Sequence, residues 1–210
     1  NPMEIGIGLD PTLRLSWDEQ RTVVKEAAAL GYASAWSNSN ATGRDALHVC
    51  AQWHAASGLA TGISVVPAPA WSPATLASSA ATVADLTGGR FSLGIGTGGS
   101  YTEAFRRSYG LPELPPITTM RDYLAIVRGL LAGERVDHDG KVLSLRGLQL
   151  AFKPPPVPVY LGALGPQMVR LAGEAADGAS LNWCSAGQVA WSRERLNEGA
   201  ARAGRDPGSL

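Results

Sequence analysis

The chain has 210 residues, and its 18 basic side chains balance its 18 acidic ones, so the formal net charge at pH 7 is zero. Only 17% of the residues are charged, which argues against nucleic acid or a membrane surface as the main partner. Hydrophobic residues make up 45% of the sequence, enough for a sizeable core in one large domain or two small ones.

Cysteine and histidine usage narrows the class of protein further. Cys50 and Cys184 lie far apart and neither belongs to a C-x-x-C pair, so we expect a reducing, cytoplasmic environment. The three histidines lack the spacing of metal ligands, and we expect no metal site. The sequence has no signal-like apolar segment at its start and no apolar run of 18 residues, so we expect no membrane partner.

The first half of the chain alternates apolar strands with amphipathic helices. Strand 3–10 is followed by helix 16–31. Ser16 and Glu19 form a capping box at the start of this helix, and Gly31 marks its end. The pattern then predicts, in chain order, strand 33–39, helix 45–57, strand 60–68, helix 73–87 and strand 91–97.

The second half interrupts this alternation once. Helix 117–133 follows the fourth strand after a long interval, and residues 134–157 contain a hairpin closed by Asp139–Gly140 and a stiff proline-rich segment. The alternation then resumes with strand 158–164, helix 166–176, strand 178–183 and helix 187–203. Strands that are apolar on both faces and joined by helices predict a parallel sheet, here a single α/β domain over residues 1–210.

Glycines after the fourth strand match a dinucleotide-binding fingerprint. Gly94, Gly96 and Gly99 satisfy G-x-G-x-x-G, but they lie in the fourth strand–helix unit, and a helix follows them in place of a second strand ending in an acidic residue. We therefore do not expect a Rossmann site. The remaining common architecture is the (β/α)₈ barrel, which binds ligands at the carboxyl ends of its strands.

The predicted strand ends are small, hydroxylated or glycine-rich, and they carry almost no charge. They read SNSN, SVVPAP, GTGGS, GALGPQM and NWCS after the second to sixth strands. Such a rim suits a large planar ligand with many hydrogen bonds better than metal-assisted or paired-carboxylate chemistry.

Three segments carry a resemblance to a known family, and they read ADLTGGRFSLGIGTGG, PPVPVYLGALGPQMVRLAGEAADGASLNWCS and ARAGRDP. The chain resembles the luciferase-like monooxygenase superfamily over essentially its whole length, and most of all the branch that depends on the deazaflavin coenzyme F420. The resemblance implies a TIM-like barrel of the bacterial-luciferase type, with a flavin or deazaflavin held across the carboxyl ends of the strands.

The resemblance also assigns cofactor-binding residues at the ends of strands three and four. Ser64 and Val65 match a dipeptide that often forms a non-proline cis peptide bond behind the cofactor ring, although an ordinary trans bond stays open. Thr97 and Gly98 match the loop along the cofactor's side chain. Glycines in this loop either let the backbone approach a phosphorylated tail or serve a tight turn with positive φ.

After strand five the resemblance places the loop that binds the cofactor's phosphate, comprising Ala163, Leu164, Gly165, Pro166, Gln167 and Met168. The residues support this assignment independently, because Gly165–Pro166 opens a helix whose free N–H groups and positive dipole end suit an anion. Asn182 and Trp183 match the end of strand six, where Trp183 either covers the cofactor or caps the barrel.

Two features depart from the family pattern. In the sugar-phosphate dehydrogenases of this branch, strand two ends in an Asp–His pair and the strand-four loop carries a Glu, whereas this chain has Asn38–Ser39 and Gly99. Asn38 can hydrogen-bond a ring carbonyl or nitrogen of the cofactor but cannot take up a proton, so we favour reduction or oxygen-dependent chemistry and assign no catalytic residue. Secondly, the chain has six strand–helix units and lacks the expected strands seven and eight. A truncated chain, missing C-terminal sequence and a shortened homologue closed as a homodimer all remain open.

Three functions follow as alternatives. The favoured one is an oxidoreductase that transfers a hydride between F420 and a small-molecule substrate. The second is a monooxygenase that uses reduced FMN and O₂. The third is a non-catalytic cofactor-binding protein or an inactive fragment.

Overall fold

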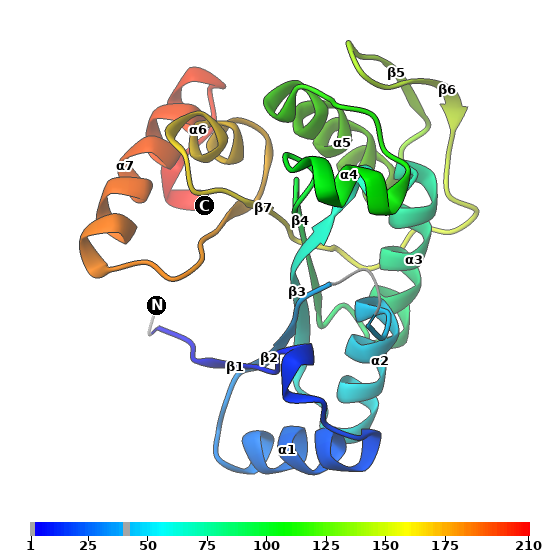
Figure 1. The fold of residues 1–210 in the computed structure, drawn as a ribbon, viewed down its shortest axis with the longest axis vertical. Helices are drawn as coiled ribbons and strands as arrows, with labels where there is room; N and C mark the ends of the chain where they lie inside the picture. Colours follow the sequence, from blue (N-terminus) through cyan, green and yellow to red (C-terminus); the bar gives the residue numbers. More distant parts are fainter. Residues whose placement is uncertain (1–2, 40–42) are drawn as a thin grey trace.

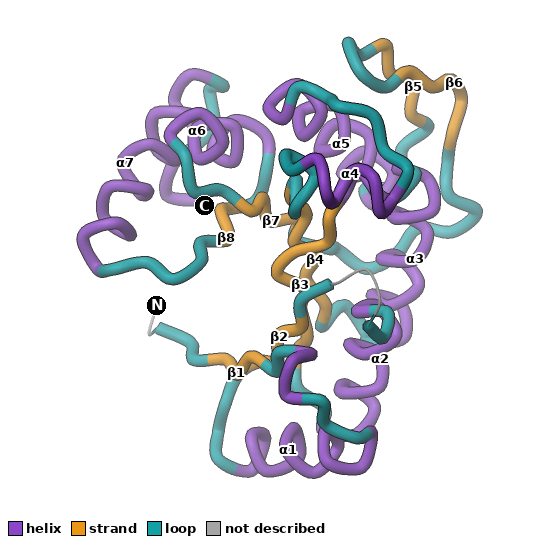
Figure 2. The backbone as a smooth tube through the Cα atoms, viewed as in Figure 1, coloured by secondary structure: helices purple, strands orange, loops and turns teal. Residues whose placement is uncertain are grey.

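A computed structural model describes residues 3–39 and 43–210 of the chain. At its centre lies one parallel sheet in the order β1-β2-β3-β4-β7-β8. Figure 1 and Figure 2 show these strands as an arc with the helices on its outer side, open between β1 and β8. The strands are β1 (Gly6–Gly8), β2 (Ser34–Ser37), β3 (Ala60–Pro67), β4 (Phe91–Gly96), β7 (Val159–Gly162) and β8 (Gly178–Ser180).

Helices connect these strands, and a small hairpin interrupts the connection between β4 and β7. The α-helices are α1 (Trp17–Ala29), α2 (Ala46–Ser57), α3 (Pro73–Leu86), α4 (Glu103–Tyr109), α5 (Pro116–Leu131), α6 (Pro166–Ala175) and α7 (Ala186–Arg202). The hairpin pairs β5 (Val136–Asp139) with β6 (Ser144–Leu148) in antiparallel fashion. Short 3₁₀ turns lie at Pro11–Leu13, Ala68–Ala70 and Pro207–Ser209.

The two faces of the main sheet differ sharply in side-chain size. The outer face buries large aliphatic residues under the helices, and Ile63, Leu93, Ile95 and Leu161 are all fully buried there. Because successive side chains of a strand point to opposite faces, the alternate residues line the inner face. That face carries mainly glycine and serine, namely Gly62, Ser64, Gly94, Gly96, Gly162 and Ser180.

Contacts across the inner face show how strongly the sheet curls. The hydroxyls of Ser64 on β3 and Ser180 on β8 lie 2.5 Å apart although two strands separate them in the sheet. The rings of Trp36 on β2 and Tyr160 on β7 also meet across the inner face, edge to face, with centroids 6.4 Å apart. The predicted architecture, an incomplete TIM-like barrel of six strand–helix units, is therefore confirmed.

The six main strands and six helices expected from the sequence are all present, with bounds that differ by up to three residues, mostly toward shorter elements. The capping box of Ser16 and Glu19 forms as predicted, and Ser72 caps α3. Helix α4 was not predicted, because its seven residues are too few to show a periodic pattern between the glycine-rich turn and the prolines that follow. In the described ranges 3–39 and 43–210, no helix is long and apolar enough to cross a membrane.

The hairpin differs from the prediction in its turn. Asp139 still belongs to β5 and pairs with Ser144, so the turn comprises residues 140–143 and is longer than an Asp139–Gly140 turn. The reason is the buried carboxylate of Asp122 on α5, which accepts hydrogen bonds from the amides of Val142 at 2.8 Å and Leu143 at 2.9 Å. A tertiary contact thus selects the turn.

Asp122 also pairs with His138 of β5, whose Nε2 lies 3.0 Å from its carboxylate. Desolvation raises the pKa of Asp122, but the hydrogen bonds from Leu143, Val142 and His138 outweigh it, so the pKa is lowered overall. A carboxylate with a lowered pKa in the folded state stabilises the fold above its ordinary pKa, and this stabilisation is lost as the pH falls through the folded-state value.

We expect Asp122→Asn to lower the free energy of unfolding by about 1–3 kcal/mol at pH 7, because an amide cannot accept from three donors as a carboxylate does. Urea denaturation at a series of pH values measures this. The difference between wild type and variant should shrink as the pH falls below the ordinary pKa of an aspartate and through the lowered pKa of Asp122 in the folded state. Asp139→Asn, at an exposed ion pair with Arg146, is the matched control and should change little. An equal loss in both variants would contradict the role of Asp122.

Candidate active site at the carboxyl ends of the strands

The residues expected to bind a cofactor all lie at one end of the sheet. Ser37 pairs with Ile63, so Asn38, just after β2, follows beside Ser64 of β3. Pro67 pairs with Gly96, which places the turn of Thr97 and Gly98 beside the end of β3. The segment from Ala163 to Met168 leaves the same end of β7, where the Ala163 amide donates to the Ser180 carbonyl. The structure therefore brings all the predicted site residues to one rim.

The end of β3 carries an irregularity that shapes the inner face. The Ser64–Val65 peptide bond is cis, as expected, and the pairing register between β3 and β4 shifts between Ile63 and Val66. This geometry lays the Val65 side chain over two glycines of the neighbouring strands. A Cβ atom at Gly96 would lie 2.8 Å from Val65 Cγ2, and one at Gly162 would lie 3.1 Å from Val65 Cγ1.

We call Gly94, Gly96 and Gly162, together with the methyl groups of Val65 above them, the glycine floor. A Cβ at Gly94 would collide with the carbonyl oxygen of Ile63, so only glycine fits under the bulge. The floor presents backbone and two methyl groups and no long side chain, which fits the face of a planar ring. The glycine motif therefore lets Val65 of β3 pack over β4 and β7.

The turn after β4 is shaped by its own contacts. Gly98 has a φ of +55°, which confirms the predicted tight turn at that position, and its Cβ would lie 2.6 Å from Pro67 Cβ. A Cβ at Gly99 would lie 2.7 Å from the ring of Phe105 on α4. Thr97 stays half-exposed at the edge of the floor.

The start of α6 is open to an anion. Its cap residue is Gly165, which has no side chain to accept from the first-turn amides, whereas α1, α2, α3, α4 and α7 are capped by Ser16, Asp45, Ser72, Thr102 and Ser185. The amides of Gln167 and Met168 lie in the first turn, where no intrahelical acceptor exists. The residues from Leu164 to Gln167 are exposed. This end fits a phosphate group.

Two of the predicted loop residues can contribute only their backbone. Ala163 is 3% exposed and belongs to the main core, and the half-buried Met168 packs against that core. Trp183 is 97% exposed with a φ of +47°, so within the described chain it does not cap the barrel.

Sequence reasoning missed one residue of the rim. Asp10 lies two residues after β1 and accepts hydrogen bonds from the Thr12 amide and from Asn38 Nδ2, both at 2.8 Å. The hydrogen bonds from Thr12 and then that from Asn38 lower the pKa of Asp10, so it is ionised at neutral pH. Its position at the end of the first predicted strand was the signal that could have found it.

Asp10 sets the orientation of the Asn38 side chain. Because the carboxylate takes a donor, it holds Nδ2 of Asn38 and turns Oδ1 the other way. Oδ1 is buried and has no hydrogen-bond partner among the described residues. A buried acceptor without a donor is costly, so the bond from Nδ2 to Asp10 holds Asn38 in an arrangement that its own oxygen does not favour.

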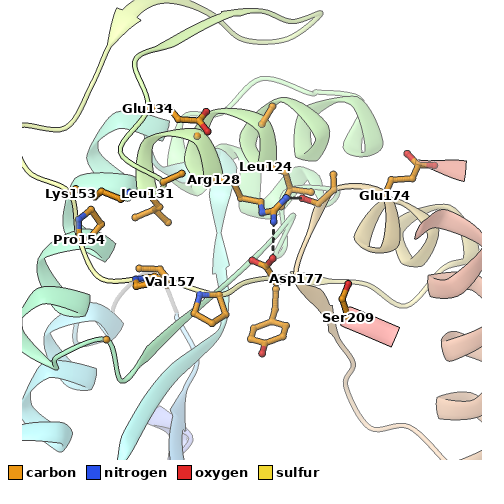
Figure 3. A pocket seen from close by; sticks show the side chains of 18 of the residues that line it. Leu124, Arg128, Leu131, Glu134, Lys153, Pro154, Val157, Glu174, Asp177 and Ser209 are labelled. Carbon is orange, nitrogen blue, oxygen red and sulfur yellow. Dashed lines mark hydrogen bonds and ion pairs between the residues drawn. The ribbon is translucent and has the colours of Figure 1, made fainter. Parts of the chain in front are cut away.

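The hollow drawn in Figure 3 does not belong to the rim of predicted site residues. It has a volume of about 1190 Å³ and is lined by residues that precede the strands, such as Val157 and Pro158 before β7 and Asp177 before β8, together with α5 and α6. It therefore opens at the amino ends of the strands. Barrels of this type bind their substrates at the opposite end.

The curled parallel sheet, the cis bond at the end of β3 and the open start of α6 agree with a comparison of sequences. The sequence profile described as luciferase-like monooxygenase matches residues 3–210. The chain belongs to this family. Its family membership and its fold were thus both predictable from the strand-end motifs.

Individual relatives share part of the chain. A 5,10-methylenetetrahydromethanopterin reductase from Methanolobus tindarius is 39% identical over 134 residues, which cover 64% of this chain and 40% of that protein. An F420-dependent glucose-6-phosphate dehydrogenase from Nocardia farcinica is 35% identical over 172 residues, which cover 75% of this chain and 50% of that protein.

A solved structure resembles the fold as a whole. The coenzyme F420-dependent tetrahydromethanopterin reductase from Methanopyrus kandleri superposes with a TM-score of 0.85 at 24% identity, over 98% of this chain and 63% of that chain. The matched part thus spans less than two thirds of each of the three related proteins.

We expect Asn38→Ala to raise the pKa of Asp10, because the carboxylate loses the Nδ2 donor that favours its charged form. An NMR titration of the side-chain carboxyl carbon measures the midpoint. Thr12→Ala is the comparison variant and should raise the midpoint further, because it removes the Thr12 hydroxyl, whose hydrogen bond lowers the pKa of Asp10 most, while the Thr12 amide stays. An unchanged midpoint in Asn38→Ala would show that the two side chains do not interact in solution.

Proposed function

We propose that this chain binds coenzyme F420 across the carboxyl ends of its strands and acts as an oxidoreductase on a small organic substrate. The observation that carries the proposal is the open start of α6 beside the glycine floor. A phosphate-binding helix end next to a flat surface suits a planar ring with a phosphorylated tail. The names of two of the related proteins include F420, which supports this cofactor over other tricyclic ones.

Each part of the rim has a role in this proposal. The amides of Gln167 and Met168 bind the phosphate, and the Thr97–Gly98 turn lies along the chain between phosphate and ring. Val65 contacts one face of the ring and excludes water from it. Asn38 borders the ring just after β2, where its bond to Asp10 holds its side chain in place.

When bound, F420 supplies a hydride or accepts one at its ring, and the protein supplies binding, orientation and exclusion of water. None of the six strand ends in the described chain carries a histidine or a lysine. Asp10 is ionised and already engaged by Thr12 and Asn38, which makes it a poor proton acceptor. We therefore favour reduction of the substrate over oxidation of an alcohol.

Binding of the two cofactors separates the proposal from its alternatives. We expect F420 added to the purified protein to give a saturable change in absorbance, and FMN to bind more weakly. Tighter binding of FMN, together with oxygen consumption on addition of reduced FMN, would favour a flavin monooxygenase. Binding of neither would leave a protein that does not use such a cofactor.

We expect Gln167→Pro to weaken F420 binding by about tenfold or more, because it removes one amide donor from the charged phosphate. Proline is tolerated in the first turn of a helix, so α6 keeps its fold. Gln167→Ala keeps the amide and is the control, with an affinity close to wild type. A fluorescence titration measures both, and an equal loss in the two variants would mean that the side chain, not the amide, contacts the ligand.

A further inference from the structure

Helix α6 ends differently from the other α-helices of the described chain. A glycine with φ between +59° and +86° follows each of the others within two residues, namely Gly31, Gly58, Gly88, Gly110, Gly133 and Gly204. Such a left-handed residue lets the chain turn back and bond the last carbonyls of a helix. After α6 the chain goes straight into extended backbone at Ala176, with a φ of −111°, and β8 begins at Gly178. The usual way to satisfy the last carbonyls is therefore missing.

Two guanidinium groups take the place of that turn. Nη1 of Arg205 donates to the carbonyls of Gly173 and Ala176, both at 2.7 Å. Nη1 of Arg128 donates to the carbonyl of Ala175 at 2.8 Å, and its Nη2 donates to Asp177 at 2.7 Å (Figure 3). Arg128 comes from α5 and Arg205 from the turn after α7. The end of α6 is thus tied to both neighbouring helices.

Placing two cations together has a cost that the carbonyls and Asp177 offset. Desolvation lowers the pKa of Arg205, and so does the charge of Arg128. The group stays charged at neutral pH, since the ordinary pKa of arginine lies far above neutrality. Positive charge at the carbonyl end of a helix is favourable, because the helix dipole is negative there. Although Arg128 lines the hollow of Figure 3, the donors named above are engaged with α6 and Asp177.

Close contact with α7 restrains α6 along its length. A Cβ on Gly173 would collide with the carbonyl oxygen of Leu196 on α7, and one on Gly199 would collide with the carbonyl oxygen of Arg170 on α6. The two helix backbones therefore touch. With ten residues, α6 is about 15 Å long, so a tilt at one end displaces the other.

We propose that Arg205 is a positioning residue for the phosphate-binding end of α6. By holding the carbonyl end of the helix, it sets where the amides of Gln167 and Met168 lie at the rim. The two hydrogen bonds from Nη1 of Arg205 go to carbonyls of α6 and of the residue after it, whereas Arg128 also bonds Asp177. This inference rests on the proposed function, because it requires that a phosphate binds at the start of α6.

The test compares F420 with its phosphate-free deazaflavin, which keeps the ring and the ribityl chain but lacks the phosphate. Fluorescence titration gives the affinity of the wild type and of each variant for both ligands. We expect Arg205→Gln to weaken F420 binding on the order of threefold to tenfold and to leave binding of the phosphate-free ligand unchanged. Arg205→Lys should recover part of the loss, since an ammonium group donates to the same carbonyls without the fork geometry of arginine.

Arg202→Gln is the matched control. Arg202 ends α7 and is exposed, so this variant removes the same charge from the same region without touching the carbonyls of α6. Both ligands should bind it as they bind the wild type. If Arg205→Gln does not fold, the same comparison is made with Arg205→Lys, which should then weaken F420 alone.

Three outcomes would overturn the inference. Equal weakening of both ligands in the Arg205 variants would mean that the residue supports the fold in general. Unchanged F420 binding in Arg205→Gln would mean that the carbonyl end does not set the amide end. A wild-type protein that binds neither ligand, or shows no preference for the one with phosphate, would overturn the proposed function and the inference with it.

Discussion

The site depends on the difference in side-chain size between the two faces of one parallel sheet. Large aliphatic side chains on the outer face hold the helices, while glycine and serine on the inner face let the strands curl tightly. Only because Gly94, Gly96 and Gly162 lack side chains can the end of β3 place Val65 over its neighbours. The absence of bulk, more than any reactive group, makes the surface on which we propose the cofactor ring lies.

The two ends of helix α6 differ in how their free backbone groups are satisfied. At its start, a glycine cap leaves two amides without a partner, and at its end two arginines satisfy three carbonyls. Free donors at a helix start suit a ligand only if the helix is held in place. The carbonyl end supplies that restraint, and the contact with α7 extends it along the helix.

Much of the fold could be predicted from the sequence, because its strands and helices carry clear local patterns. The capping box of α1, the proline starts of α3 and α6 and the strand-end motifs are all local signals, and the resemblance they support is confirmed by the family match. The cis bond at Ser64–Val65 was expected from the resemblance alone, since nothing in the two residues requires it. The assignment of the rim residues to a cofactor stays a prediction.

What could not be predicted depends on contacts between distant segments. The turn of the hairpin is set by Asp122, about 20 residues earlier in the chain. One partner of Asp10, Asn38, follows another strand, and Arg205 reaches carbonyls about 30 residues before it. Helix α4 was missed for a different reason, because it is too short to show periodicity. In each case the local pattern is compatible with several structures and packing selects one.

The serine pair at the rim has a consequence for how this surface can change. Ser64 and Ser180 touch although β4 and β7 lie between their strands. The contact between these two small side chains therefore sets how far the arc can close. A bulkier residue at either place would force the arc wider and alter the spacing between the floor and α6. The size of these two side chains therefore sets the width of the proposed cofactor site through the curvature of the sheet.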